Sequence, residues 1–261
     1  MPSAGKADAS SSASLQWPAR QYRPRYSEFP YTKADFVRHD SSSDGSFYSS
    51  PRFVTHIDDA AITALRCYYD YALPKKGRIL DFCSSWISHY PERIGQAVKN
   101  GDLVIVGMGM NNAEILQNLN NTPTVPVEVC GGQHAEGTGL LDASTCVVSI
   151  DYLIHPLEVL SSLRERTRIG GTVHLAVSNR CFPSKAVSRW LESTEEQRLA
   201  MVGDYLWFSG WKDVEIIDVK AGYQQCANAP DQGQSGLQGF MSMMGMTHED
   251  PLWVVRARRT E

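Results

Sequence analysis

The chain has 261 residues, 42% hydrophobic and 21% charged, so it can bury a sizeable core as one large domain or a domain with an ordered extension. A net charge of −4 argues against a general role in binding nucleic acid or anionic lipid. The longest apolar runs fall far short of the roughly twenty residues that cross a bilayer, so no membrane partner is expected.

The N-terminal residues 1–20 are rich in Ser and Ala and are expected to form a disordered tail. They contain neither the apolar run of a secretory signal nor an Arg before Arg20, so a cytoplasmic location is favoured over organelle targeting. The six cysteines are scattered singly, without a CxxC pair. This pattern indicates a reduced interior and predicts no metal site.

Residues 21–76 are predicted to form an irregular arm and one amphipathic helix, 53–73, whose apolar positions recur at intervals of three and four. Short apolar strands then alternate with helices in the predicted main domain, 77–261. The predicted strands cover 77–82, 102–106, 124–129, 143–150, 172–177, 214–219 and 252–257. The predicted helices among them cover 91–100, 111–120, 157–167, 185–191 and 195–206.

Apolar strands separated by helices are typical of a parallel sheet that is covered on both faces. Residues 220–251 are predicted to be a long loop without a helix, so the last two strands should pair antiparallel. The expected fold class is α/β. It is a doubly wound, mostly parallel seven-stranded sheet with helices on both faces and a terminal antiparallel pair.

Ligands of such a sheet bind beyond the carboxyl ends of the parallel strands. After the first predicted strand come Cys83, Ser84 and Ser85, small residues that let the backbone approach a ligand and offer donors to it. Ser149 and Tyr152 follow the fourth predicted strand in a similar way. The sequence therefore predicts a ligand site at these strand ends.

The order of elements and the segments 47–58, 81–91, 106–111 and 147–153 resemble the class I S-adenosylmethionine (SAM)-dependent methyltransferases. Within these, the chain is most similar to the branch with the type 11 methyltransferase domain. The resemblance implies a Rossmann-like methyltransferase fold, SAM as cofactor and methyl transfer to a small-molecule acceptor.

By position, the resemblance implies that Asp81 begins the cofactor-binding motif and that Cys83 and Ser85 stand at two of its glycine positions. Ile87 stands at the third, so none of the three glycines is present. Gly109 occupies the place of the acid that usually holds the ribose hydroxyls, so Asn111 or a serine would have to supply neutral hydrogen bonds instead.

Two further side chains are expected at the ends of the cofactor. Glu128 matches the residue that accepts from the adenine amino group, although a solvated loop carboxylate is an equal alternative. Arg52, in the arm that would cover the pocket, is expected to pair with the methionine carboxylate. The complete expected cofactor set is Tyr48, Arg52, Asp81, Cys83, Ser84, Ser85, Met110, Asn111, Glu128, Val129 and Ser149.

In-line methyl transfer needs alignment and exclusion of water, and a base only where the acceptor must lose a proton. The candidates for a catalytic role are Tyr152, His56 and His89. For each histidine, a hydrogen-bonded structural role is the alternative.

Two other functions remain open. Residues 104–113 also resemble a dinucleotide fingerprint, with Gly107 and Gly109 between a strand and a helix, which would make the protein an NAD(P)-dependent oxidoreductase. Asn112 stands at the third glycine position, however, and a strand and a helix already lie upstream. The missing glycines and ribose acid leave a third interpretation, a catalytically inactive methyltransferase-like binding module.

Overall fold

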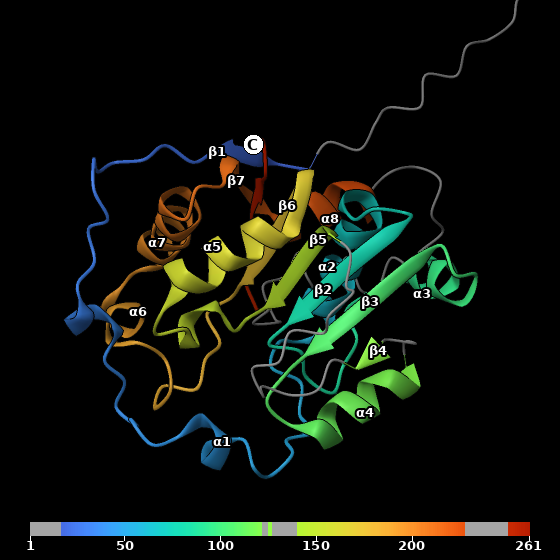
Figure 1. Ribbon diagram of the computed structural model, residues 1–261, viewed down its shortest axis with the longest axis horizontal. Helices are drawn as coiled ribbons and strands as arrows, with labels where there is room; N and C mark the ends of the chain where they lie inside the picture. The colour runs from blue at the N-terminus through green and yellow to red at the C-terminus, as the bar shows by residue number, and fades with distance from the viewer. Residues whose placement is uncertain (1–16, 122–124, 127–139, 228–249) are drawn as a thin grey trace, which may run out of the picture.

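The computed structural model describes residues 17–121, 125–126, 140–227 and 250–261. Its centre is one sheet in the order β1-β7-β8-β6-β5-β2-β3-β4 (Figure 1). The strands are β1 (Ala19–Gln21), β2 (Gly77–Phe82), β3 (Leu103–Met108), β4 (Val125–Pro126), β5 (Leu141–Val147), β6 (Thr167–Val177), β7 (Lys212–Asp218) and β8 (Trp253–Arg258).

The expected fold class is confirmed. Strands β6, β5, β2, β3 and β4 are mutually parallel, whereas β8 runs antiparallel to both β6 and β7. The chain builds outward from β2 to β4 and then returns to place β5 on the other side of β2. This reversal creates a topological switch point between β2 and β5, where doubly wound sheets bind their ligands.

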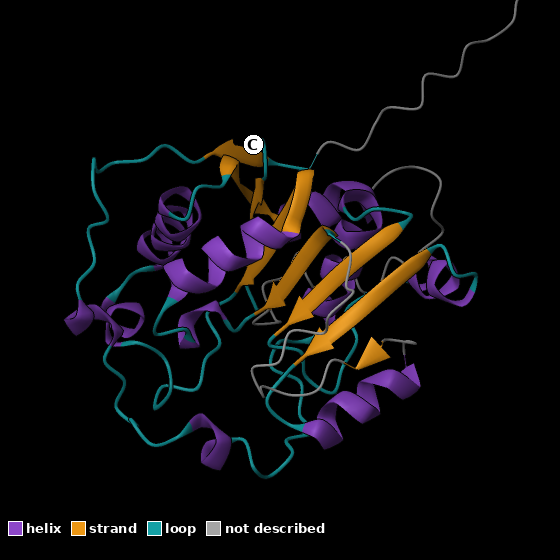
Figure 2. Ribbon diagram, viewed as in Figure 1, coloured by secondary structure: helices purple, strands orange, loops and turns teal. Residues whose placement is uncertain are grey.

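Helices cover both faces of the sheet (Figure 2). Helices α5 (Pro156–Arg166), α6 (Ser188–Glu192) and α7 (Glu195–Phe208) bury apolar side chains on one face. Helices α2 (Asp59–Ala72), α3 (Glu92–Lys99) and α8 (Val219–Ala227) do so on the other. The remaining helical elements are α1 (Asp44–Phe47), α4 (Asn112–Asn121) and the 3-10 turns η1 (Lys33–Phe36) and η2 (Ile150–Tyr152).

Helix α2 begins later than the predicted 53–73, because Asp58 caps it. The Asp58 carboxylate accepts a hydrogen bond of 2.6 Å from the Ala61 amide, as an N-cap residue does. Buried apolar side chains recur at Ala61, Leu65 and Tyr68, so the predicted amphipathic face is real. Residues 53–57 therefore lie outside the helix, and His56 and Ile57 among them line the cavity at the strand ends.

Two predictions about the carboxyl-terminal half were wrong. Strand β6 starts at Thr167 and passes through Gly170, whose φ is +83°, so these glycines do not separate a helix from a strand starting at 172. Helix α8 occupies part of the predicted loop 220–251, and residues 228–249 lie outside the described part of the chain. The antiparallel pairing of β7 with β8 is confirmed although its premise, the absence of a helix, fails.

The structure differs from the expected tail 1–20 at its last residues. Residues 1–16 lie outside the described part, but Trp17 is buried and its ring lies 5.4 Å from that of Tyr68. Residues Ala19–Gln21 form β1, an unpredicted eighth strand that pairs antiparallel with β7. Burial of this large indole ring fixes the chain directly before β1.

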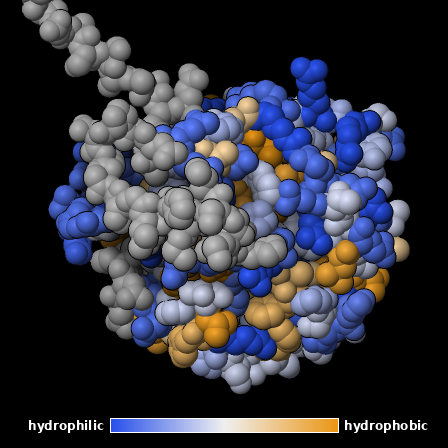
Figure 3. Space-filling model, turned by 180° about the vertical axis from the view of Figure 1, so that it is seen from behind, coloured by the Kyte–Doolittle hydropathy of each residue, from blue (hydrophilic) through white to orange (hydrophobic). Residues whose placement is uncertain are grey.

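The described surface seen from behind is mostly hydrophilic, with small groups of apolar residues between hydrophilic ones (Figure 3). Among the described residues, no helix combines the length and apolar character that a membrane span requires.

Candidate functional site

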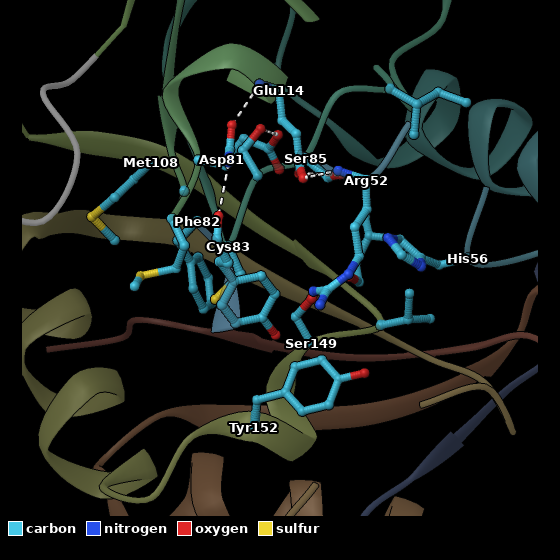
Figure 4. Close-up of a pocket in the computed structure, with 18 of the residues that line it drawn as sticks. Arg52, His56, Asp81, Phe82, Cys83, Ser85, Met108, Glu114, Ser149 and Tyr152 are labelled. Carbon is cyan, nitrogen blue, oxygen red and sulfur yellow. Dashed lines mark hydrogen bonds between the residues drawn. The ribbon is translucent and has the colours of Figure 1, made fainter. Parts of the chain in front are cut away.

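A cavity of about 280 Å³ lies at the carboxyl ends of β2, β3 and β5, covered by a segment of the arm, residues 48–57, that we call the lid (Figure 4). Twelve of the residues expected from the sequence line this cavity. They are Tyr48, Arg52, His56, Asp81, Cys83, Ser84, Ser85, His89, Met110, Asn111, Ser149 and Tyr152. Glu128 and Val129 lie outside the described residues, so their roles stay predictions.

The turn after β2 keeps a glycine-like backbone without glycine. Cys83 has a φ of 57°, in the left-handed region that favours glycine. A Cβ atom on Gly109 would collide with the carbonyl oxygen of Ser84, so glycine is required where β3 ends. The two strand ends can therefore approach closely, and an acid cannot stand at position 109 without moving this turn.

Asp81 lies on the cavity floor within a hydrogen-bonded chain. Its carboxylate accepts from the Ser84 hydroxyl at 2.7 Å and from the Thr145 hydroxyl at 3.0 Å. The Thr145 oxygen in turn lies 2.6 Å from the Tyr90 hydroxyl. Burial raises the pKa of Asp81 to about 6, against the two hydroxyl hydrogen bonds, which lower it.

Sequence reasoning missed Glu114, an almost fully buried carboxylate on α4 that lines the cavity. One of its oxygens accepts from the Arg52 amide at 2.7 Å, and the other accepts from the Ser85 hydroxyl at 3.1 Å. Glu114 stands three residues after Asn111, the spacing of an ordinary capping box. From the sequence alone, Glu114 therefore looks like a helix-capping residue. In the structure its carboxylate instead joins the lid to the β2 turn.

The Asn111 side chain is engaged within the protein. Its oxygen accepts from the amides of Ala113 and Glu114, and so caps α4. Its nitrogen donates to the carbonyl oxygens of Tyr48 at 2.8 Å and Ser49 at 3.3 Å. In this conformation the amide holds the lid on α4 and has no donor left for the ribose contact that the sequence suggested.

Arg52 carries a positive charge into the cavity. Its guanidinium lies 4.1 Å from the centre of the Phe47 ring and 5.2 Å from that of Phe182. Among the described residues no carboxylate forms an ion pair with it, and its Nη1 atom is buried without a hydrogen bond. Figure 4 shows the side chain reaching from the lid toward Ser149. A half-buried cation with a buried Nη1 atom that lacks a hydrogen bond favours an anionic ligand.

The three candidate catalytic groups are uncharged near neutral pH. Burial lowers the pKa of His56, and burial together with Arg66 lowers that of His89 to about 4. Burial also raises the pKa of Tyr152, whose hydroxyl oxygen accepts from the Phe182 amide at 2.8 Å. The pocket therefore offers two weak bases and a protonated phenol.

No protein-family model matches the chain, and no curated relative matches it. Many solved structures do, with low identity. A phosphoethanolamine N-methyltransferase 2 from Haemonchus contortus in complex with SAM has 13% identity and a TM-score of 0.46, covering 76% of this chain and 52% of that one. The chain thus spans about half the length of that protein.

Two further matches are of similar strength. A putative SAM-dependent methyltransferase from Listeria monocytogenes has 10% identity and a TM-score of 0.48, covering 78% of this chain and 100% of that one. A SAM-dependent methyltransferase from Archaeoglobus fulgidus has 12% identity and a TM-score of 0.45, covering 76% and 92%.

Proposed function

We propose that the protein is a SAM-dependent methyltransferase that acts on a small-molecule acceptor. One observation carries the proposal: residues chosen from separate segments of the sequence line a single cavity at the switch point between β2 and β5. The lid, the β2 turn, the start of α4 and the end of β5 all contribute to it.

The residues present fit SAM. The missing Cβ of Gly109 opens the cradle between the β2 and β3 ends. The Arg52 guanidinium, which forms no ion pair with any residue that the structure describes, suits the methionine carboxylate. Asp81 offers a carboxylate to the amino group. Glu114 takes the role of the ribose acid that position 109 cannot hold. Each of its carboxylate oxygens accepts one hydrogen bond from the described residues and keeps a second lone pair for a ribose hydroxyl.

SAM would supply a methyl group bound to an electrophilic sulfonium. The protein's own part is alignment and exclusion of water by the lid. The ring faces of Tyr48 and Tyr152 can stabilise positive charge beside them. Since His56 and His89 are weak bases, the site favours acceptors that already carry a free lone pair at neutral pH.

The oxidoreductase alternative is less well supported. A dinucleotide fingerprint requires free amides at the start of its helix to bind the pyrophosphate. Here the Asn111 oxygen occupies the amides of Ala113 and Glu114, and the Glu114 carboxylate adds negative charge beside them. The inactive module rests on the missing glycines and the missing ribose acid, but the left-handed turn at Cys83 and the Glu114 carboxylate support a cradle that does not need them.

Calorimetry with SAM and with NAD in parallel tests the proposal. We expect SAM to bind and NAD not to bind. Arg52→Gln and Glu114→Gln should each weaken SAM binding by about 1.5–3 kcal/mol, the value of hydrogen bonds to charged groups. The matched control is Arg20→Gln, which removes an exposed ion pair with Glu196 at 2.5 Å and should leave affinity unchanged.

Formation of S-adenosylhomocysteine in the presence of metabolite mixtures would then identify the acceptor. NAD binding without SAM binding would overturn the assignment in favour of the oxidoreductase. Absence of binding by either compound would favour the inactive module.

A further inference from the structure

Two thiols meet at the edge of the cavity. Cys83 follows β2 directly and lines the pocket (Figure 4), whereas Cys146 lies fully buried in β5, the neighbouring strand. Both are free thiols, and Cys83 packs against the apolar cluster that contains Cys146.

The sheet register brings the two residues within reach of a disulfide. Asp81 pairs with Thr145 in the parallel ladder, so Cys83 and Cys146 are offset by one residue along neighbouring strands. In this register Phe82 stands opposite Cys146 at the usual strand spacing of about 4.8 Å, and Cys83 is the next residue of the chain. The two cysteines are therefore close neighbours at adjacent strand ends, as a disulfide requires. The left-handed φ of Cys83 breaks the regular strand alternation, which agrees with its packing against the cluster that contains Cys146.

The two thiols differ in access to solvent. Cys83 can be reached through the cavity, but Cys146 has no exposed surface. The interaction with Cys83 and burial also raise the pKa of the Cys146 thiol, which makes Cys146 a weak nucleophile toward a dissolved oxidant. An oxidant that enters the pocket therefore reacts with Cys83 first, and Cys146 is the neighbouring thiol that can react with the oxidised Cys83.

We propose that Cys83 and Cys146 form an oxidative modification site that hydroperoxides convert to an intramolecular disulfide, closing the cofactor cradle. The sulfur of Cys83 attacks one peroxide oxygen, which breaks the O–O bond and gives a sulfenic acid and, from hydrogen peroxide, water. The Cys146 sulfur then attacks the Cys83 sulfur, forming the S–S bond and releasing a second water. In sum, two thiols and one hydrogen peroxide give one disulfide and two waters.

The disulfide acts on the turn that holds the cradle together. Ser84 and Ser85 follow Cys83 directly and donate to Asp81 and Glu114. Pulling the Cys83 sulfur toward β5 displaces this turn, so the oxidised protein loses its ligand. This second part rests on the proposed function, whereas disulfide formation does not. A dithiol reductant reverses both.

Peptide mapping of the full-length chain tests the first part. After a short exposure to hydrogen peroxide and alkylation of the remaining thiols, a non-reducing digest should contain one cross-linked peptide pair with Cys83 and Cys146. Dithiothreitol should abolish it. Cys146→Ser, which is close in size, should give no cross-link and only oxygen adducts on Cys83. Cys146→Ala serves where the serine is not tolerated.

The matched control is Cys181→Ser, since Cys181 is a half-buried free thiol outside the pair, and this variant should still form the cross-link. Absence of the cross-linked pair from the oxidised wild type, with folding intact, would overturn the proposal. So would a cross-link that survives in Cys146→Ser.

Calorimetry with SAM before and after oxidation tests the second part. Wild type should lose SAM binding with the appearance of the disulfide and regain it with dithiothreitol. Unchanged affinity in protein carrying the disulfide would refute the closing of the cradle. A disulfide in protein whose reduced form binds no SAM would support the thiol site while refuting the methyltransferase assignment.

Discussion

Two of the three described non-glycine residues with a positive φ stand at the strand ends that meet beside the cavity. Cys83 and the β-branched Val148 have φ values of 57° and 41°. Each such residue costs roughly 1–2 kcal/mol. Hydrogen bonds within the sheet offset this cost: the Ser84 amide donates to Met108 and the Val148 amide to Ala176, at 2.8 and 3.0 Å. The strain turns both chains sharply out of the sheet, which gives the pocket its floor.

Asp151, next to Tyr152, is a carboxyl group that the fold buries without a full set of partners. It is 2% exposed, and its Oδ2 atom has no hydrogen bond. Burial raises its pKa to about 8, above the value of 3.8 expected for an unfolded chain. The folded state thus binds the proton more tightly, and the free energy of unfolding should fall as pH rises from about 4 to about 8.

Asp151→Asn should remove this pH dependence, because an amide does not ionise. We expect the variant to be more stable than wild type at pH 8.5 by an amount on the order of a few kcal/mol, with little difference at pH 4.5. Urea unfolding at several pH values measures it. Asp70→Asn, which alters an exposed carboxylate paired with Arg93, is the control and should not change the slope. Parallel pH profiles for wild type and Asp151→Asn would contradict the assignment.

At the scale of elements, the sequence predicts best where one segment carries its own periodicity. Strand β2 has the predicted bounds, because a short apolar run between Pro74 and the polar β2 turn has little freedom. Strand β1 has only three residues and forms through distant β7, so no local pattern reveals it. Helix α8 contains Gly222, an unfavourable helix residue that the Trp17 ring requires because a Cβ there would strike it.

In the candidate site too, the sequence predicts residues that have a local signal and misses residues that depend on distant contacts. Residues directly after strands could be found, because element order alone brings the ends of parallel strands together. Glu114 on a helix and Thr145 inside β5 depend on how distant segments pack, which the sequence does not display. The Asn111 side chain was expected at the ribose, but its geometry is decided by a cap and by a lid contact with Tyr48.

The buried lysine Lys185 binds the part of the arm that leads into the lid. Lys185, between β6 and α6, has no exposed side-chain surface, and its ammonium lies 3.1 Å from Asp40 and 3.3 Å from Asp44. It also donates to the Ser42 carbonyl oxygen at 2.8 Å. The segment it holds continues through Phe47 into the lid.

Lys185→Met keeps most of the side-chain volume but removes the charge and its donors. We expect the free energy of unfolding to fall by about 1–3 kcal/mol. This is less than for a fully buried ion pair, because both carboxylates keep contact with water. Cleavage by trypsin or chymotrypsin within residues 21–58 should accelerate. Lys76→Met, which removes an exposed ion pair with Asp102, should change stability by less than about 0.5 kcal/mol. Equal protease resistance in both variants would show that the arm is held elsewhere.

At the scale of the whole molecule, the arm is part of the core rather than an appendage. It starts as an edge strand of the sheet, passes along α7 and ends as the roof of the cavity (Figure 1). Trp17 packs into the cluster beneath α2, whereas Phe29 and Tyr31 pack into the cluster beneath α7. The arm thereby joins the two faces of the sheet, so its unfolding should be coupled to that of the domain.

Asp204 allows this coupling to be measured. Its carboxylate is fully buried in α7 and accepts from the hydroxyls of Tyr22 and Tyr31, the latter at 2.7 Å. Tyr31→Phe removes one hydrogen bond to a charged acceptor and should lower the free energy of unfolding by about 1.5–3 kcal/mol. For a domain of this size, this corresponds to a fall in Tm of about 5 °C. Tyr26→Phe changes a tyrosine of the same arm that is 47% exposed, and should leave Tm unchanged.

Because the arm lies in both apolar clusters, the lowered transition of Tyr31→Phe should remain single. Near-ultraviolet circular dichroism, which reports the aromatic packing of the arm, should change at the same temperature as the far-ultraviolet signal of the helices and strands. An early near-ultraviolet transition, with the helices still intact, would mean that the arm detaches by itself. The roof of the cavity would then open independently of the sheet, and ligand affinity would fall well below the melting temperature of the domain.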